Sequence, residues 1–362
     1  MKICLKPSNV RVCIKMITML SLVAMITSVV CFPLAAASQI YRWQDEKGYW
    51  HFTEGPGPQQ LDRQPAGEDA SAPTEATHSS ETAPPDRSSS HPDANALLWR
   101  IEAPGGRPSF ILGTIHSTDP RVTRLRPDVL ERLDGSDRFV MEMVLDTKAF
   151  MQLGTAMLLA PESDLKTLLG TALYDRVVSA MADRQMPESF VQRLKPWAVM
   201  ALLSMPKTTG GQILDMVLYQ RASSQGKPTS GLESAAEQLD VFEGLSSQDQ
   251  IELLKMTLDQ LPAQQSLLEQ LIVAYAADDL KRMVAIAQRS YVQSRNGSAQ
   301  RFMTRLNEAR NQRMVERIIA YLQQGNCFIA VGALHLAGHG GILYSLDQRG
   351  YRIEPVRVGP QS

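Results

Sequence analysis

From residue 96 onward, short apolar runs alternate with longer stretches in which apolar residues recur every three or four positions. The runs LLWRIEA, PSFILGTIH, DRFVMEMVL, CFIAVGALH and YRIEPVRV have the length and the β-branched content of buried strands. Residues 146–225 and 246–324 have helical spacing instead, and KPTSGLESAAEQL passes from a short strand into a helix. Strands mixed with helices, without a repeat of fixed period, predict an α/β body. In it, helices cover a mixed β-sheet and a large helical insertion interrupts the strands.

Three segments of different composition precede this body, which we place at residues 96–362. Residues 1–37 carry basic residues, an apolar stretch and an Ala-Ala-Ala end, the arrangement of a secretory signal peptide. Residues 38–58 flank the polar turn DEKG with aromatic residues, which predicts a small β-hairpin module. This module resembles a short one, of unknown function, that often follows the signal peptide in bacterial envelope proteins. Residues 59–95 are rich in Pro, Ser, Ala and acidic residues, so we expect a disordered linker.

The amino-terminal pattern predicts where the protein works. A cleaved signal peptide implies an exported protein of the periplasm or cell envelope, with no stable membrane span after cleavage. An uncleaved membrane anchor is the alternative, because the apolar stretch is long for a signal peptide. Three of the four cysteines lie in this segment, which leaves only Cys327 in the predicted mature chain. The folded body is therefore not expected to depend on disulfides.

Charge excludes one class of partner. Without the four basic residues of residues 1–37, the chain has 33 basic and 38 acidic residues, a net charge of −5. A mildly acidic chain without a basic cluster gives no support to a nucleic-acid partner.

Two of the apolar runs end in the same motif, Gly-x-x-His. His116 follows FILG and His335 follows IAVG, and the chain has only six histidines. Ligands of open α/β sheets collect at the carboxyl ends of strands, where both histidines are expected. Each motif alone is weak, because a histidine after a strand is commonly a hydrogen-bonded structural residue. Two histidines in the same local context commonly contribute ligands to one metal site.

Two glutamates extend this candidate site. Glu142 stands inside the run FVMEMVL, where a charged residue is costly to bury unless it is paired or bound to a metal. An edge strand that exposes Glu142 to water is the alternative. Glu233 follows KPTSGL. The alternative interpretation is that Glu233 only starts a helix, where the helix dipole stabilises its carboxylate. Two histidines and two glutamates form a plausible ligand set for a divalent ion (Mn, Co or Zn) with open positions for water.

The order of these motifs makes the chain resemble the TraB/GumN family, which includes PrgY-like proteins and the TIKI proteases. The family belongs to a wider group with the erythromycin-esterase-like and ChaN-like proteins. The resemblance covers nearly all of residues 96–358 and rests on GTIH, GSDRFVMEM, KPW, GKPTSGLES, EARNQRM and VGALHLAGHGGI in that order. It implies that Arg310 and Asn311 are the family's Arg-Asn pair. The chain departs from the family at Val144, where an acidic residue is usual, and His339 falls in a variable loop, so we expect it at the surface.

The resemblance implies a hydrolase of peptidase type. A metal held by His116, His335 and one or both glutamates would activate water. The remaining glutamate, for which Glu233 is the first choice over Glu142, would transfer the proton. Arg310 would stabilise the anionic intermediate.

Two other functions remain open at this point. One is a metal-free, esterase-like hydrolase in which a histidine–glutamate pair activates water. The other is a non-catalytic protein that binds and sequesters a peptide. The expected substrate is a peptide or a small amide or ester, and the sequence predicts no oligomeric state.

Overall fold

A computed structural model describes residues 41–44, 50–53, 95–206, 210–288 and 297–356. The predicted signal peptide and all of the predicted linker except Asn95 lie outside these ranges. The hairpin and the body belong to separate units. In the hairpin, β1 (Tyr41–Gln44) pairs antiparallel with β2 (Trp50–Thr53), as the aromatic residues on both sides of DEKG predict. None of the helices in the described ranges combines the length and the apolar character needed to cross a membrane.

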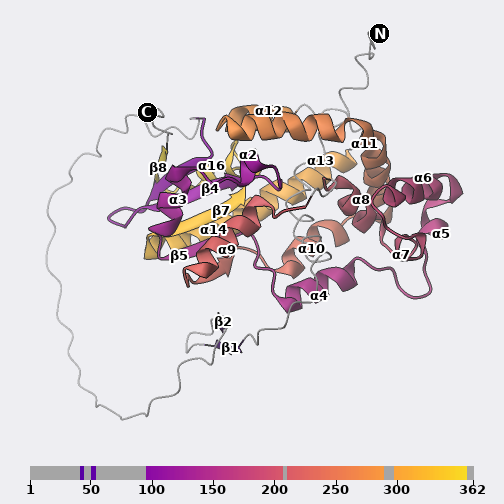
Figure 1. Ribbon diagram of the computed structural model, residues 1–362, viewed down its shortest axis with the longest axis horizontal. Coiled ribbons are helices and arrows are strands. Elements are labelled where there is room, and N and C mark those ends of the chain that lie inside the picture. The colour runs from indigo at the N-terminus through magenta and orange to yellow at the C-terminus, as the bar shows by residue number, and fades with distance from the viewer. Residues whose placement is uncertain (1–40, 45–49, 54–94, 207–209, 289–296, 357–362) are drawn as a thin grey trace, which may run out of the picture. The chain divides into compact units, whose positions relative to one another are not determined.

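The body is built on a six-stranded mixed sheet with the strand order β6-β5-β7-β4-β3-β8 (Figure 1). Its strands are β3 (Leu98–Glu102), β4 (Ser109–Thr114), β5 (Arg138–Met141), β6 (Thr229–Gly231), β7 (Cys327–Gly332) and β8 (Arg352–Pro355). Strands β6, β5, β7 and β4 are mutually parallel, whereas β3 is antiparallel to both of its neighbours. Every residue of β4 and β7 is buried, which explains their almost continuous apolar sequences.

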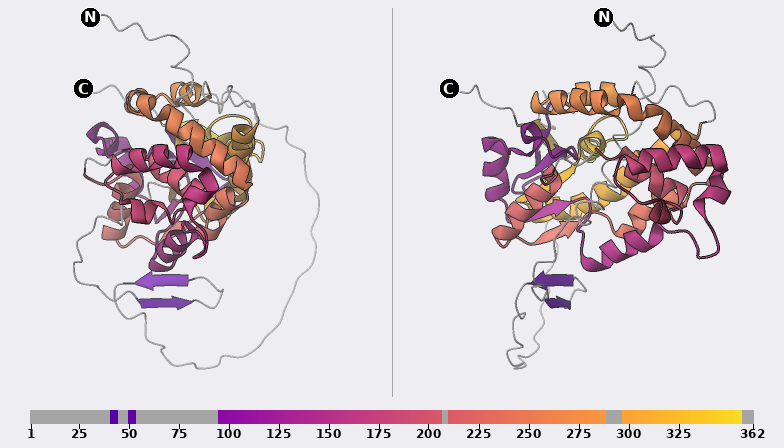
Figure 2. Two further views of the ribbon diagram at one scale, coloured as in Figure 1. Left: turned by 90° about the vertical axis from the view of Figure 1, so that its right-hand side faces the viewer. Right: turned by 45° about the vertical axis from the view of Figure 1, so that its right-hand side comes forward.

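Helices fill the long connections between the strands. They are α2 (Pro120–Thr123), α3 (Pro127–Asp134), α4 (Thr147–Ala156), α5 (Leu165–Leu169), α6 (Thr171–Ala182), α7 (Glu188–Val191), α8 (Pro196–Ser204), α9 (Leu214–Ser224), α10 (Ala235–Glu243), α11 (Ser247–Ala276), α12 (Leu280–Gln288), α13 (Ser298–Met303), the π-helix η3 (Thr304–Ala309), α14 (Arg310–Gln324), α15 (Ala333–Leu336) and α16 (Ile342–Asp347). Figure 2 shows α5–α8, in magenta and rose, gathered to one side of the sheet. This arrangement confirms the predicted α/β class, with a mixed sheet, covering helices and a helical insertion.

The strand ends differ from the sequence prediction in two details. β5 ends at Met141, so Glu142 lies directly after the strand instead of inside it. β5 pairs with β6 on one side and β7 on the other, so the edge-strand alternative for Glu142 is wrong. β7 ends at Gly332, and His335 lies in the short helix α15 that follows.

The position of Glu233 follows from two local signals. The pairing of β5 with β6 continues past the strand ends, where the Glu233 N–H donates to the Glu142 carbonyl at 2.7 Å. Helix α10 then begins with a capping box, in which Ser234 and Glu237 exchange side-chain and backbone hydrogen bonds. Glu233 is therefore held between a strand and a capped helix.

Gly113 allows β4 to pack closely against α15. A Cβ atom at this position would lie 2.9 Å from Leu336 Cδ1 and 3.0 Å from Ala333 Cα. Gly113→Ala is therefore expected to displace the His335-bearing helix and to lower the free energy of unfolding by about 1–3 kcal/mol. Urea denaturation measures this loss.

The matched control is Gly154→Ala in α4, where a Cβ would meet nothing within 4 Å. This change is expected to stabilise the protein by roughly 0.5–1 kcal/mol, because alanine favours helix. Equal effects of the two substitutions would contradict the close approach at Gly113.

Candidate active site

Four parallel strands each place one predicted site residue at their carboxyl ends. His116 follows β4, Glu142 follows β5, Glu233 follows β6 and His335 follows β7. All four residues are buried, with exposed fractions of 3–6%. Because β7 lies between β4 and β5, the chain brings residues from its two ends to one edge of the sheet. The structure thus brings all four residues together at the place where α/β sheets bind ligands.

His335 is held in one tautomer. Its Nδ1 lies 2.6 Å from Asn311 Oδ1, and the Asn311 amide nitrogen donates to the Gly340 carbonyl at 2.7 Å. Since the amide oxygen can only accept, Nδ1 carries the proton and Nε2 keeps its lone pair. Burial lowers the pKa of His335 to about 4, although the nearby Glu142 carboxylate acts in the opposite direction. Nε2 is therefore an electron-pair donor at neutral pH.

His116 is held by Asp215, a residue that the sequence analysis missed. Asp215 is buried in α9, where its Oδ1 accepts from the Thr114 hydroxyl at 2.9 Å. Its Oδ2 lies 3.0 Å from His116 Nδ1. In the described part of the chain, both ring nitrogens of His116 and Asp215 Oδ2 are buried without a hydrogen bond of good geometry, so the contact at Nδ1 is an ion-pair distance and Nε2 has no partner. The available signal was an acidic residue inside the apolar stretch ILDMVL, where burial demands a partner.

Glu142 faces His335 with one oxygen and an arginine with the other. Its Oε1 accepts from the Gly332 N–H at 2.6 Å and lies 3.7 Å from His335 Nε2. Its Oε2 accepts from Arg310 Nη2 at 2.8 Å. Burial by itself would raise the pKa of Glu142, but Arg310, His335 and the Gly332 N–H lower it to about 2. Glu142 is thus a buried carboxylate that stays ionised at neutral pH.

Glu233 is engaged almost entirely by arginine. Arg310 donates to Glu233 Oε2 from Nε at 2.8 Å and from Nη2 at 2.6 Å. Arg313 lies 3.3 Å from Oε1, and Gln238 donates to Oε2 at 3.4 Å. The helix-dipole alternative for Glu233 is therefore replaced by a buried ion pair.

Arg310 joins the two glutamates and is itself fully buried. Besides Glu142 and Glu233, its Nη1 donates to the Leu306 carbonyl at 3.4 Å. Leu306 belongs to the π-helix that directly precedes Arg310, and such segments are frequent at functional sites. All three guanidinium nitrogens are thus engaged within the protein, an arrangement that orients carboxylates instead of facing a substrate.

Three atoms have the donor chemistry that divalent transition metals prefer: His116 Nε2, His335 Nε2 and Glu142 Oε1. In both histidines a side-chain oxygen lies next to Nδ1, the arrangement by which proteins orient metal-binding imidazoles and increase their basicity. Across the described residues, no group of three or more His, Cys, Asp or Glu side chains is already drawn together closely enough to hold an ion. The donor chemistry fits a metal, and Glu142 fits the ligand role better than Glu233, whose oxygens are held by arginines.

The loop after α15 agrees with the sequence interpretation. His339 is exposed, and its ring contacts the edge of the Tyr344 ring at a centroid distance of 4.9 Å. Val144 is half-buried. Neither residue adds a donor atom to the site.

The pKa values of the two histidines are shifted in opposite directions. Burial would lower the pKa of His116, but the Asp215 carboxylate beside its Nδ1 raises it above its usual value. Its protonation therefore stabilises the metal-free fold at low pH, and this stabilisation is lost as the pH rises through the raised pKa. His335 has the opposite sign. Between its usual pKa near 6.5 and about 4, only the unfolded chain binds the proton, so the free energy of unfolding falls as the pH is lowered.

Nuclear magnetic resonance titration of the imidazole protons in metal-free protein measures both values. Asp215→Asn is expected to lower the pKa of His116, because the charge that raises it is removed, and to leave His335 near 4. A wild-type His335 that titrates above His116 would contradict the assignment.

Comparisons with known proteins identify families and relatives that this chain matches. The profile of the TraB/PrgY/gumN family matches residues 97–355, and that of the domain of unknown function DUF4124 matches residues 28–89. The chain is 27% identical over 323 residues to Metalloprotease TIKI2 of Danio rerio, covering 74% of this chain and 62% of the relative. It is 25% identical over 329 residues to Metalloprotease TIKI1 of Homo sapiens, covering 74% and 63%. The chain spans less than two thirds of the length of these relatives. No solved structure gives a match.

Proposed function

Because the chain belongs to the TraB/PrgY/gumN family, we propose that its four strand ends form the active site of a metal-dependent hydrolase that cleaves peptides. One observation carries this proposal: the Nε2 atoms of His116 and His335 are available beside the ionised Glu142, while a side-chain oxygen lies next to each Nδ1. The name metalloprotease, given to relatives in Danio rerio and Homo sapiens, supports the same reaction class.

His116, His335 and Glu142 would hold the ion, for which Mn, Co and Zn are the candidates. When bound, the ion would supply Lewis-acid activation of water and of the scissile carbonyl. Asp215 and Asn311 keep the two imidazoles in the orientation that turns Nε2 toward the site.

The buried arginine has a positioning role in this proposal. Arg310 binds Glu233 through two nitrogens and Glu142 through one, so it sets the orientation of the Glu142 carboxylate. Proton transfer by Glu233 would require Arg310 and Arg313 to release its oxygens. We therefore assign Glu233 to holding Arg310, and Glu142 to the ligand set.

A metal-free hydrolase is the second candidate, and the pair of His116 and Asp215 favours it. A carboxylate that orients a histidine through Nδ1 and raises its pKa is the arrangement of a general base. In that mechanism His116 Nε2 would take the proton from water directly, and His335 would remain a neutral neighbour.

Chelation separates the two candidates. The purified full chain is screened against a peptide library, dialysed against a chelator and then supplied with Mn, Co or Zn. We expect activity to fall by about 100-fold or more on chelation and to return with one of these ions. Activity that chelation leaves unchanged would select the metal-free mechanism. If no peptide, amide or ester is turned over with any of these ions, hydrolysis is contradicted. The remaining hypothesis is then a non-catalytic protein that sequesters a peptide.

We place the reaction in the cell envelope, because residues 1–37 have the pattern of a signal peptide. Amino-terminal sequencing of the chain recovered from the envelope fraction checks this placement. A first residue near 38 is expected, and an intact amino terminus would contradict cleavage.

A further inference from the structure

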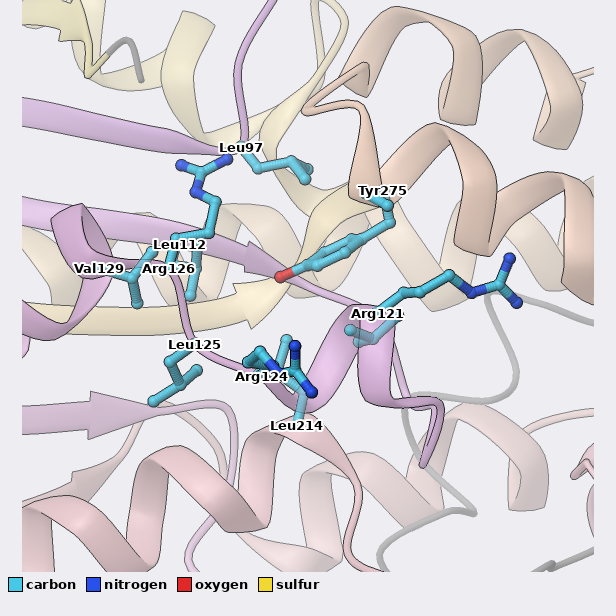
Figure 3. A pocket seen from close by; sticks show the side chains of 11 residues that line it. Leu97, Leu112, Arg121, Arg124, Leu125, Arg126, Val129, Leu214 and Tyr275 are labelled. Atoms are coloured by element: carbon cyan, nitrogen blue, oxygen red, sulfur yellow. The ribbon is translucent and has the colours of Figure 1, made fainter. Parts of the chain in front are cut away.

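A pocket of about 70 Å³ is lined by residues that include Leu112 of β4 and Leu214 of α9 (Figure 3). Seven of its eleven lining residues are aliphatic, and they come from β4, from the residue before β3, from the segments around α2 and α3, and from α9 and α11. Leu97, Leu112, Leu125 and Leu214 are among the lining residues. At roughly 10–15 Å³ for each water-sized group, this volume accommodates about five to seven such groups, enough for one branched aliphatic side chain.

Two polar groups of this pocket have no partner. The Tyr275 side chain reaches from the end of α11 toward β4, and its hydroxyl points into the pocket (Figure 3). Within the described ranges, neither this hydroxyl nor the guanidinium of Arg124, an exposed residue at the rim of the pocket, makes a hydrogen bond or an ion pair. The other two arginines of the pocket are compensated, Arg121 by two carboxylates and Arg126 by two more. The pocket therefore presents one uncompensated cation and one free phenol next to an aliphatic wall.

The pocket shares structural elements with the active site. Leu112 lines the pocket, and Thr114, two residues further along β4, binds Asp215. Leu214 lines the pocket directly before Asp215 in α9. Burial and then the charge of Asp215 raise the pKa of Tyr275, which places the phenol within electrostatic reach of that carboxylate. A ligand in the pocket would thus contact the elements that hold His116.

We propose that this pocket binds an aliphatic carboxylate, with a branched side chain among the leucines and the carboxylate on Arg124 and Tyr275. A guanidinium and a phenol hydroxyl are both donors to a carboxylate, and the charge-assisted bond to arginine is the stronger one. The leucine side chains remove the aliphatic group from water. Two sources supply this chemistry: the carboxyl-terminal residue of a peptide substrate, and a free small acid. The first source rests on the proposed function, whereas the second does not require it.

Binding of N-acetyl-L-leucine to the full chain, measured by isothermal titration calorimetry, tests the pocket. Arg124→Gln is expected to weaken binding by about tenfold or more, because it removes the charge-assisted bond. Tyr275→Phe is expected to weaken it by about threefold or more, because it removes a neutral hydrogen bond. Arg121→Gln is the matched control, with the same loss of charge at the same pocket but from a paired side chain, and its effect is expected to stay below about threefold.

Further ligands test whether the carboxylate charge is needed and which of the two sources supplies the ligand. N-acetyl-L-leucinamide keeps the side chain but lacks the carboxylate, so it is expected to bind at least about tenfold more weakly. A peptide that ends in leucine is compared with its carboxyl-terminal amide. If the acid form competes with N-acetyl-L-leucine and the amide does not, the pocket holds a peptide terminus. If neither peptide competes, the site takes a free acid.

The proposal is overturned if the wild type does not bind N-acetyl-L-leucine, or if Arg124→Gln and Tyr275→Phe bind it as the wild type does. Binding is measured on chelated protein as well, so a failure of hydrolysis does not affect this test. If the protein hydrolyses peptides but does not bind N-acetyl-L-leucine, the proposal for the pocket is wrong and the proposed function stands.

Discussion

Replacement of either His116 or His335 by alanine is expected to reduce hydrolysis by about 1,000-fold or more, because each change removes a metal-donor nitrogen. Both imidazoles are buried, and a side-chain oxygen lies next to each Nδ1, so truncation to alanine removes an oriented Nε2 from the interior. The measurement is turnover of the best peptide from the library screen, with the ion content of each variant determined alongside. Loss of bound metal together with activity is the expected result.

His339→Ala is the matched control. This histidine lies four residues after His335, but it is exposed and its ring makes an edge-type contact with the ring of Tyr344. Its replacement is expected to leave activity within about twofold of the wild type, as for most exposed side chains. Circular dichroism checks that the variants remain folded. Full activity in folded His116→Ala or His335→Ala protein would show that the strand ends do not carry the chemistry.

The second large effect is expected on stability. Arg310→Met would leave the carboxylates of Glu142 and Glu233 buried without the cation that joins them. Removing one partner from a buried ion pair costs about 3–5 kcal/mol, because the remaining charge is uncompensated. Urea denaturation of the metal-free protein measures the loss. A loss of less than about 1 kcal/mol in the free energy of unfolding would be typical of a surface ion pair and would contradict the buried network.

Two companion variants locate the cause of this loss. Arg349→Met breaks an exposed pair with Glu316 and is expected to change stability by less than about 1 kcal/mol. Adding Glu233→Gln to Arg310→Met removes one buried charge and is expected to recover part of the lost stability. If the double variant is no more stable than Arg310→Met, the loss reflects packing of the long side chain instead of charge.

Local sequence patterns predicted the strands and the candidate site residues that follow them. The apolar runs before His116 and His335 are long enough to be buried strands, and the ends of parallel strands lie together in an α/β sheet. Glu142 was identified because a charge in an apolar run needs a partner, a requirement that holds whatever the partner is. The error in its placement, inside the strand instead of after it, arose because periodicity does not determine where a strand ends.

Asp215 illustrates what local patterns do not contain. It lies in a helix with apolar neighbours, 101 residues from Thr114, and nothing near it in the sequence indicates that it approaches His116. Asn311 was recognisable as part of a motif, but its contact with His335 was not. Such contacts depend on which helix covers which strand, and the packing of the whole body sets that arrangement.

The sequence by itself determined the strands, the two Gly-x-x-His motifs and the need of Glu142 for a partner, because burial and periodicity act over a few neighbouring residues. Only the tertiary structure decided the partners. Arg310 reaches Glu233 across 77 positions of the chain and Glu142 across 168. It binds both because the strand order β6-β5-β7 brings these glutamates together under one helix. An ion pair is a short-range contact in space between residues far apart in sequence, so it exists only once the sheet has formed.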